Sequence, residues 1–195
     1  MPPTSLLAWL VENLKPQTNN DAWGEEEARR KREALVRKDP AVIAEALARL
    51  KGRPGERDWD VLEGASQPDV FLETDEVVVV IEGKRTEGGP TMATTWMPVR
   101  HQMLRHLDAA WEIKGGRATY GFFIVEADAD HPGEIPPAWK DFAQATVSPE
   151  ALGGSLPHRT PQEQVRIAEA FLGVTTWQAV CARFDIPREV LIDSV

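Results

Sequence analysis

The sequence predicts a mixed-sheet α/β core with helices on its faces. Its clearest strand is the run of aliphatic residues from Val77 to Ile81, and another strand is expected over 118–127. The segment between them, 98–114, has the length and apolar spacing of a single helix. A helix that joins two strands in this way makes them parallel, whereas closely spaced strands form hairpins. We therefore expect both kinds of pairing in one sheet.

The composition is typical of one domain, or of one domain with a small appendage. The chain has 195 residues, of which 42% are hydrophobic, and a formal net charge of −9. The single cysteine, Cys181, excludes an internal disulfide, and its apolar neighbours predict a buried structural thiol. Because no apolar run has membrane-spanning length, we expect a protein of the reducing cytoplasm without a membrane partner.

Helices are expected before the sheet. The stretch 5–14 predicts an amphipathic helix that ends at the step Lys15-Pro16. Residues 24–52 predict a helix that is interrupted and restarted at Asp39-Pro40, where a capping residue precedes a first-turn proline. The segment 29–57 contains ten Lys or Arg residues against four Asp or Glu residues. It is either a nucleic-acid-binding patch or a solvated helix surface.

Strands and one further helix follow. Residues 59–64 and 69–74 predict two short strands joined by a turn-prone segment, and the long strand continues to Thr86. We expect Pro98 to open the next helix and the pair Gly115-Gly116 to end it as a left-handed cap. The predicted order is therefore helix, three strands, helix and strand.

The last third of the chain is expected to wrap around this core. The proline-rich segment 131–161 is predicted to be irregular, and helices resume at the capping-box pattern of Thr160 and Glu163. These observations divide the chain into three parts, namely an N-terminal helix and linker (1–22), the core (23–130), and the wrap with C-terminal helices (131–195).

The final segment, 175–187, predicts a short helix. Trp177, Val180 and Phe184 have the spacing of a buried helix face. The tail also faintly resembles a helix-turn-helix, but its second helix lacks the base-reading side chains of a recognition helix. Packing on the core or dimerisation is the preferred interpretation, and a small helix-turn-helix DNA binder is the alternative.

The hairpin before residue 82 predicts a charged site. If Thr74 pairs with Val77 across a tight turn, the same register puts Asp69 opposite Glu82, with Cβ atoms about 5 Å apart. Lys84 then emerges on the same face, about 6–7 Å further along the strand. Opposed carboxylates are unfavourable unless a cation lies between them, so this arrangement indicates a Mg²⁺ site. A surface hairpin whose charges pair with each other is the alternative.

Gly83 faces the other side of this strand. Its missing side chain allows another segment to approach closely, and its carbonyl oxygen is a further candidate metal ligand. Other chemistries lack a matching pattern, since we find no paired-cysteine or His-x-x-x-His spacing, no Walker loop and no G-x-S-x-G elbow.

Pro68-Asp69, followed after a strand-length gap by Glu82-Gly83-Lys84, resembles the PD-(D/E)xK motif of the restriction endonuclease-like nuclease superfamily. The resemblance covers residues 25–127 and includes that superfamily's α-β-β-β-α-β core order, here with extra N- and C-terminal helices. It implies that Asp69, Glu82 and the Gly83 carbonyl hold Mg²⁺, for which Mn²⁺ can substitute. It also implies that Lys84 orients or deprotonates the attacking water.

Superfamily members often add an acid from the first helix or first strand, for which Glu63 and then Glu45 are the candidates here. Exonuclease-like branches carry Gln and Tyr one turn apart on the following helix. This chain has Gln102 and His106 at the corresponding spacing, without the Tyr. A satisfied core histidine is the other interpretation of His106. The candidate nucleic-acid contacts are Arg85, Arg100, Gln102 and His106.

These observations together predict a Mg²⁺-dependent nuclease that hydrolyses phosphodiester bonds, with DNA as the expected partner and a homodimer as a compatible assembly. A non-catalytic module of the same fold, working in a defence or repair complex, is the main alternative.

Overall fold

The structure is a computed structural model of the chain, and it describes residues 1–15, 26–52, 62–63, 66–90, 92–94, 97–131, 133–187 and 189. Its helices are α1 (Thr4–Asn13), α2 (Glu26–Val36), α3 (Pro40–Leu50), α4 (Gln102–Ile113), α5 (Pro137–Thr146), α6 (Pro149–Ser155), α7 (Pro161–Ala170) and α8 (Trp177–Arg183). Its strands are β1 (Val70–Glu73), β2 (Val77–Lys84), β3 (Met92–Thr94), β4 (Met97–His101), β5 (Ala118–Val125) and β6 (Phe171–Thr176).

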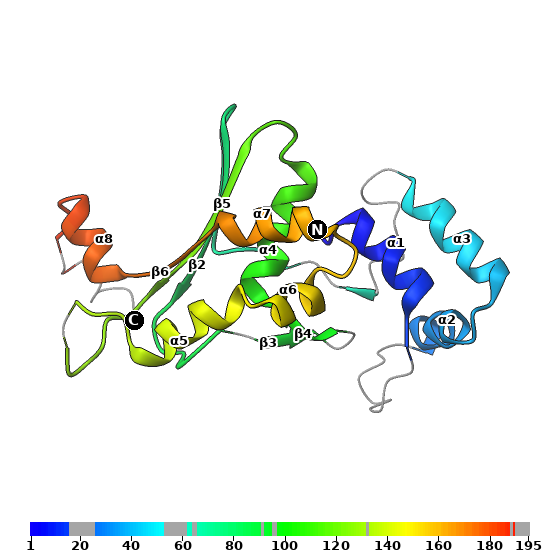
Figure 1. Cartoon of the computed structure of the whole chain (residues 1–195), viewed down its shortest axis with the longest axis horizontal. Coiled ribbons are helices and arrows are strands. Elements are labelled where there is room, and N and C mark those ends of the chain that lie inside the picture. The colour runs from blue at the N-terminus through cyan, green and yellow to red at the C-terminus, as the bar shows by residue number, and fades with distance from the viewer. Residues whose placement is uncertain are drawn as a thin grey trace.

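A mixed four-stranded sheet forms the centre of the fold, with the strand order β1-β2-β5-β6 (Figure 1). β1 is antiparallel to β2, whereas β2 and β5 are parallel, as are β5 and β6. The predicted mixed-sheet α/β class is confirmed. The predicted hairpin register is confirmed as well, because Val70 pairs with Ile81 and the Thr74 N–H donates to the Val77 carbonyl at 2.9 Å.

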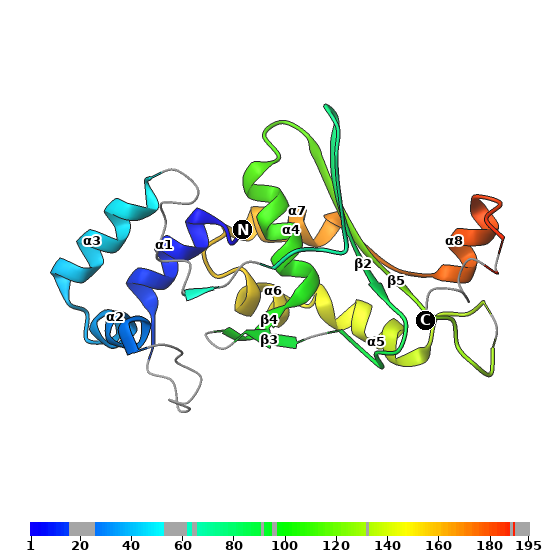
Figure 2. The same ribbon diagram turned by 180° about the vertical axis from the view of Figure 1, so that it is seen from behind.

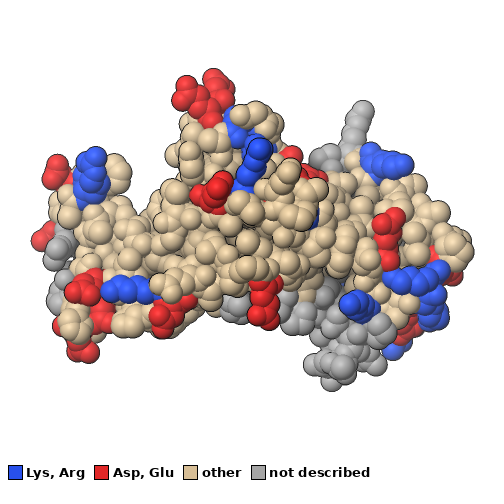
Figure 3. All heavy atoms as spheres, viewed as in Figure 1, with Lys and Arg blue, Asp and Glu red and all other residues tan. Residues whose placement is uncertain are grey.

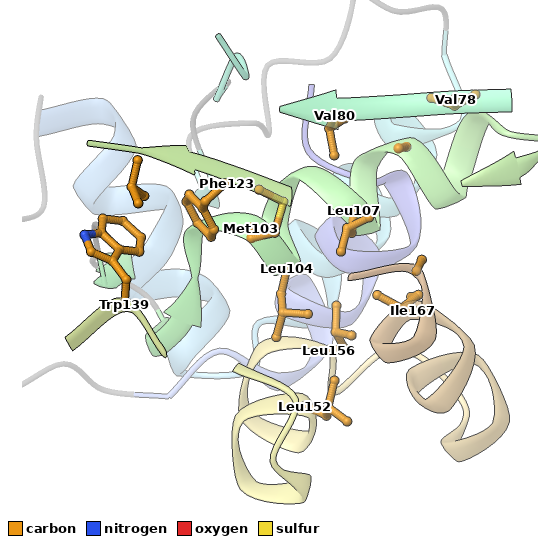
Figure 4. Packing of buried hydrophobic residues seen from close by; sticks show 13 residues of the cluster. Val78, Val80, Met103, Leu104, Leu107, Phe123, Trp139, Leu152, Leu156 and Ile167 are labelled. Atoms are coloured by element: carbon orange, nitrogen blue, oxygen red, sulfur yellow. The ribbon is translucent and has the colours of Figure 1, made fainter. Parts of the chain in front are cut away.

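The main core lies between one face of this sheet and the helices α4 to α7. Figure 4 shows side chains from β2, β5 and these four helices meeting in one layer. α4 contributes Met103 and Leu107, which lie one turn apart and are fully buried. Gly121 of β5 is required beneath them, because a Cβ there would lie 2.8 Å from Leu107 Cδ2 and 2.9 Å from Met103 Sδ. α4 therefore packs closely on the sheet.

A second, helical core is built by α1, α2 and α3. These helices lie together at one end of the molecule, away from β5 and β6, in both views (Figures 1 and 2). Their buried residues include Leu6, Leu10, Leu35 and Leu50. The predicted restart at Asp39-Pro40 is confirmed, because the Asp39 side chain caps α3 and Pro40 occupies its first turn.

The basic segment on α2 and α3 is a surface of paired charges. Arg30, Lys31, Arg37 and Arg49 each pair with a Glu four residues earlier on the same helix. Figure 3 shows blue and red side chains interspersed at this end of the molecule. Such i, i+4 pairs add little stability and leave no uniform positive field. For the described residues, this arrangement favours the interpretation of the basic segment as a solvated helix surface.

Two sequence predictions on the way to α4 are corrected. The helix begins at Gln102, not at Pro98, because 97–101 pairs as β4 with β3 in a separate two-stranded sheet. A pair of strands leaves both outer edges open, so a residue without an N–H is tolerated there. The predicted strand 59–64 falls largely outside the described residues, and its described members, Leu62 and Glu63, are not in a strand.

The proline-rich segment 131–161 is not irregular throughout, because it contains α5 and α6. Prolines stand in the first turns of both helices, at Pro137 and Pro149, where a backbone N–H has no intrahelical acceptor. The Ser148 side chain caps α6. The prolines therefore mark helix starts, and the prediction of an irregular wrap is wrong for these two stretches.

The C-terminal part agrees with the predictions at its start but not throughout. The capping box of Thr160 and Glu163 is present, and α7 buries Ile167 in the main core. The segment that follows is a strand, β6, which replaces the expected purely helical tail. Its pairing with β5 shifts register, and Gly173 within it has a φ of 91°. A bulge of this kind needs glycine and obscures the strand pattern.

α8 follows β6 and projects from the end of the sheet (Figure 1). Cys181 is buried as predicted, but Phe184 is 69% exposed, so the expected core spacing does not extend to it. The second helix of the helix-turn-helix alternative falls on residues of which only 189 is described. In the described part of the chain, no helix is both long enough and apolar enough to span a bilayer.

A chain of buried ion pairs, which we call the α4 network, fixes α4 from its other side. Its centre is Arg100, which is 1% exposed and lies 2.8 Å from Glu63 and 2.9 Å from Asp108. Arg159 continues the chain, with Nε 2.8 Å from Asp108 Oδ1 and Nη2 2.9 Å from Glu112 Oε2. The network thereby joins β4, α4 and the segment before α7.

Both carboxylates of α4 in this network are stabilised in their charged form. Burial raises the pKa of Asp108, but a hydrogen bond from His158 and the charges of Arg100 and Arg159 outweigh it and lower the pKa overall. The pKa of Glu112 is likewise lowered, since hydrogen bonds from Ser5 and Arg159 outweigh its burial. Ser5 belongs to α1, so the network also holds the helical end of the molecule against α4.

His101 should make folding stability depend on pH. Its ring is stacked on Phe142 at a centroid distance of 4.3 Å, and burial lowers its pKa from 6.5 to about 4. As pH falls below 6.5, the unfolded chain binds a proton that the folded chain does not bind until about pH 4. The free energy of unfolding should therefore decrease over this interval by about 3 kcal/mol on account of this group.

Urea unfolding between pH 7 and 4 measures this loss. His101→Phe retains the stacked ring and should abolish this part of the pH dependence. Parallel stability curves for wild type and His101→Phe would contradict the assignment.

Candidate metal and phosphate site

The candidate site lies where β2 leaves the core. Alternation along β2 directs Val78, Val80 and Glu82 to the face covered by α4, and all three are buried. α4 begins close to this strand end, so its first-turn residue Gln102 and the next-turn residue His106 face the Glu82 carboxylate. The strand therefore delivers a carboxylate to a point that the helix lines with polar groups.

Three donors surround the Glu82 carboxylate, which is 2% exposed. His106 Nε2 lies 2.7 Å from Oε1, while Gln102 Nε2 donates to Oε2 at 2.9 Å and Lys84 Nζ lies 3.2 Å from the same oxygen. The pair Gln102 and His106, predicted from their spacing, and Lys84, predicted from the strand period, are thus brought together on Glu82.

This environment keeps Glu82 ionised. Burial raises the pKa of its carboxyl, but the hydrogen bond and charge of His106, followed by those of Lys84, lower it further than burial raises it. The resulting pKa lies below its ordinary value, so the group is a carboxylate at neutral pH. A buried carboxylate of this kind can serve as a hard oxygen ligand or hold a neighbouring cation.

Asp69 joins the site from the adjacent strand. It directly precedes β1, and its Oδ2 accepts a hydrogen bond from the Gly83 N–H at 2.7 Å. The pairing of β1 with β2 ends at Val70 and Ile81, the residues that directly precede this contact on each side. The structure therefore brings the Asp69 carboxylate to the strand end that carries Glu82 and Lys84, while leaving the Asp69 side of the site open to solvent.

Gly83 is the point of closest approach by another segment, as its sequence position predicted. A Cβ on this residue would lie 2.7 Å from Cζ2 of Trp177, the first residue of α8. The indole Nε1 of Trp177 is buried and has no hydrogen-bond partner in the described part of the chain. Sequence reasoning placed Trp177 on a helical core face and missed this contact. The glycine between two charged residues signalled a close neighbour but not which one.

Arg85 lies at the edge of the site. Its Nε is 3.4 Å from Glu126 Oε2, and about a third of the side chain is exposed. Gln178 of α8 donates to the other Glu126 oxygen, and its own oxygen accepts from the Ala127 N–H at 3.2 Å. The start of α8 is thus fastened to the end of β5 beside Arg85. The prediction of a nucleic-acid contact by Arg85 is compatible with its exposure and stays a prediction.

Arg100 and Glu63 do not belong to this site. Arg100 is buried in the α4 network, so the proposed surface contact with phosphate is wrong for this residue. Both oxygens of Glu63 face arginines, since Arg100 Nε lies 2.8 Å from one and Arg105 Nε lies 3.1 Å from the other. Glu63 is therefore a partner for cationic side chains and not an available metal ligand.

Glu45 is also removed from the set of candidate ligands. It lies on α3, where it is exposed and pairs with Arg49 at 3.2 Å. α3 is at the end of the molecule opposite α8, away from the end of β2, in both ribbon views (Figures 1 and 2). Of the predicted metal ligands, Asp69, Glu82 and Gly83 remain close together.

These remaining residues fit Mg²⁺ better than a metal that needs a complete protein cage. Within the described ranges, no group of three or more His, Cys, Asp or Glu side chains gathers in a metal-binding arrangement. Mg²⁺ commonly takes one or two carboxylates and fills its other positions with water and phosphate oxygens. Gln102 donates a hydrogen bond to Glu82, and Lys84 and His106 lie at ion-pair distance, so a metal has to share this carboxylate with them. Gln102 Oε1 nearby is buried and has no hydrogen-bond partner in the described structure.

The fold and this cluster define a mixed α/β protein whose central strand ends in a buried glutamate, held by lysine, glutamine and histidine. No protein-family model, curated protein or solved structure matches the chain. A functional assignment therefore depends on the residues of the site themselves.

The contact between Gly83 and Trp177 predicts that replacing Gly83 destabilises the fold mainly while the Trp177 ring is present. Gly83→Ala forces the indole ring to move and should lower the free energy of unfolding by about 1–3 kcal/mol, as overpacking does. In a Trp177→Leu background the same change should cost much less, because the ring is absent. Urea unfolding of the four proteins gives this coupling, with Gly116→Ala as the control, since nothing lies within 4 Å of its added Cβ. Equal costs of Gly83→Ala in both backgrounds would contradict the contact.

Proposed function

We propose that this protein is a Mg²⁺-dependent nuclease that hydrolyses phosphodiester bonds, with DNA as its expected substrate. The observation that carries the proposal is the meeting of Asp69, Glu82 and Lys84 at one strand end, in the order of the PD-(D/E)xK motif. The order of the elements around this point, namely a hairpin, a helix and a parallel strand, supports the same resemblance.

Two carboxylates would hold the metal. Glu82 is ionised and rigidly placed, whereas Asp69 is exposed and reaches the same strand end from β1. Gln102 and His106 act as positioning residues, because they fix the Glu82 carboxylate from the first two turns of α4. A bound Mg²⁺ supplies a Lewis acid that offsets charge on the phosphate and lowers the pKa of a coordinated water.

Lys84 is the residue that we assign to the attacking water. Its ammonium group is 3.2 Å from Glu82 Oε2, and its side chain is 12% exposed, so it is held near the metal ligand with limited freedom. From this position it can donate to a water or to a phosphate oxygen and so orient the nucleophile. Its positive charge also offsets charge that accumulates on the phosphate during the reaction.

A non-catalytic nucleic-acid-binding module is the second candidate. The occupation of Glu82 by three neighbouring donors favours it, because metal binding has to share a carboxylate that is already balanced in charge. The scarcity of acidic ligands, with no group of three in the described residues, points the same way. Activity measurements on Lys84 and Glu82 variants separate the two candidates.

Replacing Lys84 by Ala should reduce cleavage by roughly 10²–10⁴-fold, the usual contribution of a positioned acid or base. Mg²⁺ and nucleic-acid binding should persist, since Asp69 and Glu82 remain. The measurement is a time course with supercoiled plasmid, linear duplex and single strands in Mg²⁺, Mn²⁺ or EDTA. Lys140→Ala, on the half-exposed surface of α5, is the matched control. Equal inactivity of wild type and Lys84→Ala on every substrate, with binding retained, would favour the module.

Replacing Glu82 by Gln should instead weaken Mg²⁺ binding itself, because an amide is a poorer ligand than a carboxylate for a hard dication. We expect the Kd for Mg²⁺ to rise by at least about tenfold. This is the smallest effect that is usual when a residue that only hydrogen-bonds to a metal ligand is replaced. Isothermal titration with Mg²⁺ measures it, and circular dichroism checks the fold. Glu45→Gln, on the exposed face of α3, should bind Mg²⁺ like wild type. An unchanged Kd for folded Glu82→Gln would remove Glu82 from the ligand set.

A further inference from the structure

An apolar pocket lies directly beside the candidate site. It has a volume of about 600 Å³ and is enclosed by residues 1–4, the segment 66–68, the α4 face of the hairpin β1–β2, and α4 itself. This volume falls within the range of pockets that bind small molecules. Sequence reasoning did not find it, because its walls come from three parts of the chain that are far apart in sequence.

Three wall residues connect the pocket to the site. Pro68 directly precedes Asp69, and Val80 stands two residues before Glu82 on the same face of β2. His106 belongs to both, because its ring lines the pocket while its Nε2 lies 2.7 Å from Glu82 Oε1. A molecule bound in the pocket would therefore lie next to a group held at the carboxylates.

The walls suit a flat, uncharged ring. Phe71 and Val80, which are paired across the hairpin, line it from β1 and β2, and Ala109 and Ile113 line it from α4. No Lys or Arg is among the described residues that line the pocket, so it does not offer a phosphate a charged partner. The lining carboxylate, Glu112, is already bound by Ser5 and Arg159.

Phe71 is the residue best placed to stack on a ligand. It is 45% exposed although it is aromatic and lines a pocket, so a ligand ring could cover its free face. Ser66 and Gln67 add polar groups to the wall, where they can meet the hydrogen-bonding edge of a heterocycle. A nucleobase combines these two properties, namely an apolar face and a polar edge.

We propose that this pocket receives one unpaired nucleobase, next to the phosphodiester that the candidate site holds. The proposal rests on the proposed function and specifies its substrate class. A base within a duplex is stacked on both faces and paired along its edge, so it has to leave the stack before it can enter a pocket. The protein therefore acts on single strands, or on unpaired nucleotides next to a duplex, in preference to continuous duplex.

The test compares two neighbouring exposed residues of β1. Phe71 and Leu72 are 45% and 47% exposed and point to opposite faces of the sheet, so Leu72→Ala is a matched control for Phe71→Ala. Both changes are made in the Lys84→Ala chain, which keeps the oligonucleotide intact. Fluorescence anisotropy in Mg²⁺ then gives the Kd for a labelled thymidylate strand of about twelve nucleotides.

Phe71→Ala should raise this Kd by about 5- to 100-fold, which is the loss of one base–aromatic stack, and Leu72→Ala should leave it unchanged. A strand of the same length built from abasic units should bind weakly and equally to all the proteins. Continuous duplex should not distinguish Phe71→Ala from its parent. Ala109→Phe, which fills the pocket from α4, should weaken binding of the thymidylate strand as Phe71→Ala does.

Equal Kd values for Phe71→Ala and Leu72→Ala, or equal binding of abasic and thymidylate strands, would overturn the proposal. A parallel cleavage assay with chains that retain Lys84 separates it from the proposed function. Cleavage without dependence on Phe71 would leave the nuclease and remove the base pocket. Binding that depends on Phe71, in a protein that cleaves nothing, would leave the base pocket on a non-catalytic module.

Discussion

The position of α4 is the constraint on which the rest of the structure depends, and the buried α4 network fixes it. Arg100 is enclosed between Glu63 and Asp108, and Arg159 bridges Asp108 and Glu112. Charges as deeply buried as these are tolerated only when each has a partner of opposite sign with good geometry. The requirement for complete pairing leaves α4 few alternative positions. The opposite side of the helix presents Gln102 and His106 to Glu82, so the network and the site share one rigid element.

The candidate site follows the same electrostatic rule on a smaller scale. Glu82 is buried, and the donors around it compensate for the water that it has lost. This cluster is open to solvent on one side, because Asp69 is exposed, and Gln102 Oε1 lacks a hydrogen-bond partner in the described structure. An incompletely satisfied polar cluster at the end of a core strand is a suitable place for a cation and a phosphate. In the proposed function, the apolar pocket beside it would add a surface for the uncharged part of the same ligand.

Local features of the sequence predicted a substantial part of this arrangement. The tight turn after Thr74 and the period of two along β2 set the register that aligns Asp69, Glu82 and Lys84. Gln102 and His106 were expected on one helix face because residues four apart share a face. The helix starts at Pro40 and Pro161 could also be predicted from the sequence, since an Asp or Thr cap directly precedes a first-turn proline in each case.

The sequence by itself therefore determined the mixed-sheet class, the hairpin register and the residues of the charged cluster, all of which follow from patterns within short stretches of the chain. Only the tertiary structure decided the pairing of β6 with β5, the burial of Arg100 and the packing of Trp177 on Gly83. Each depends on partners distant in the chain, about which local periodicity carries no information. Arg100 is the clearest example, because an arginine near a charged strand is equally suited to phosphate and to carboxylate. In the fold it pairs with the carboxylates of Glu63 and Asp108, which the sequence alone did not indicate.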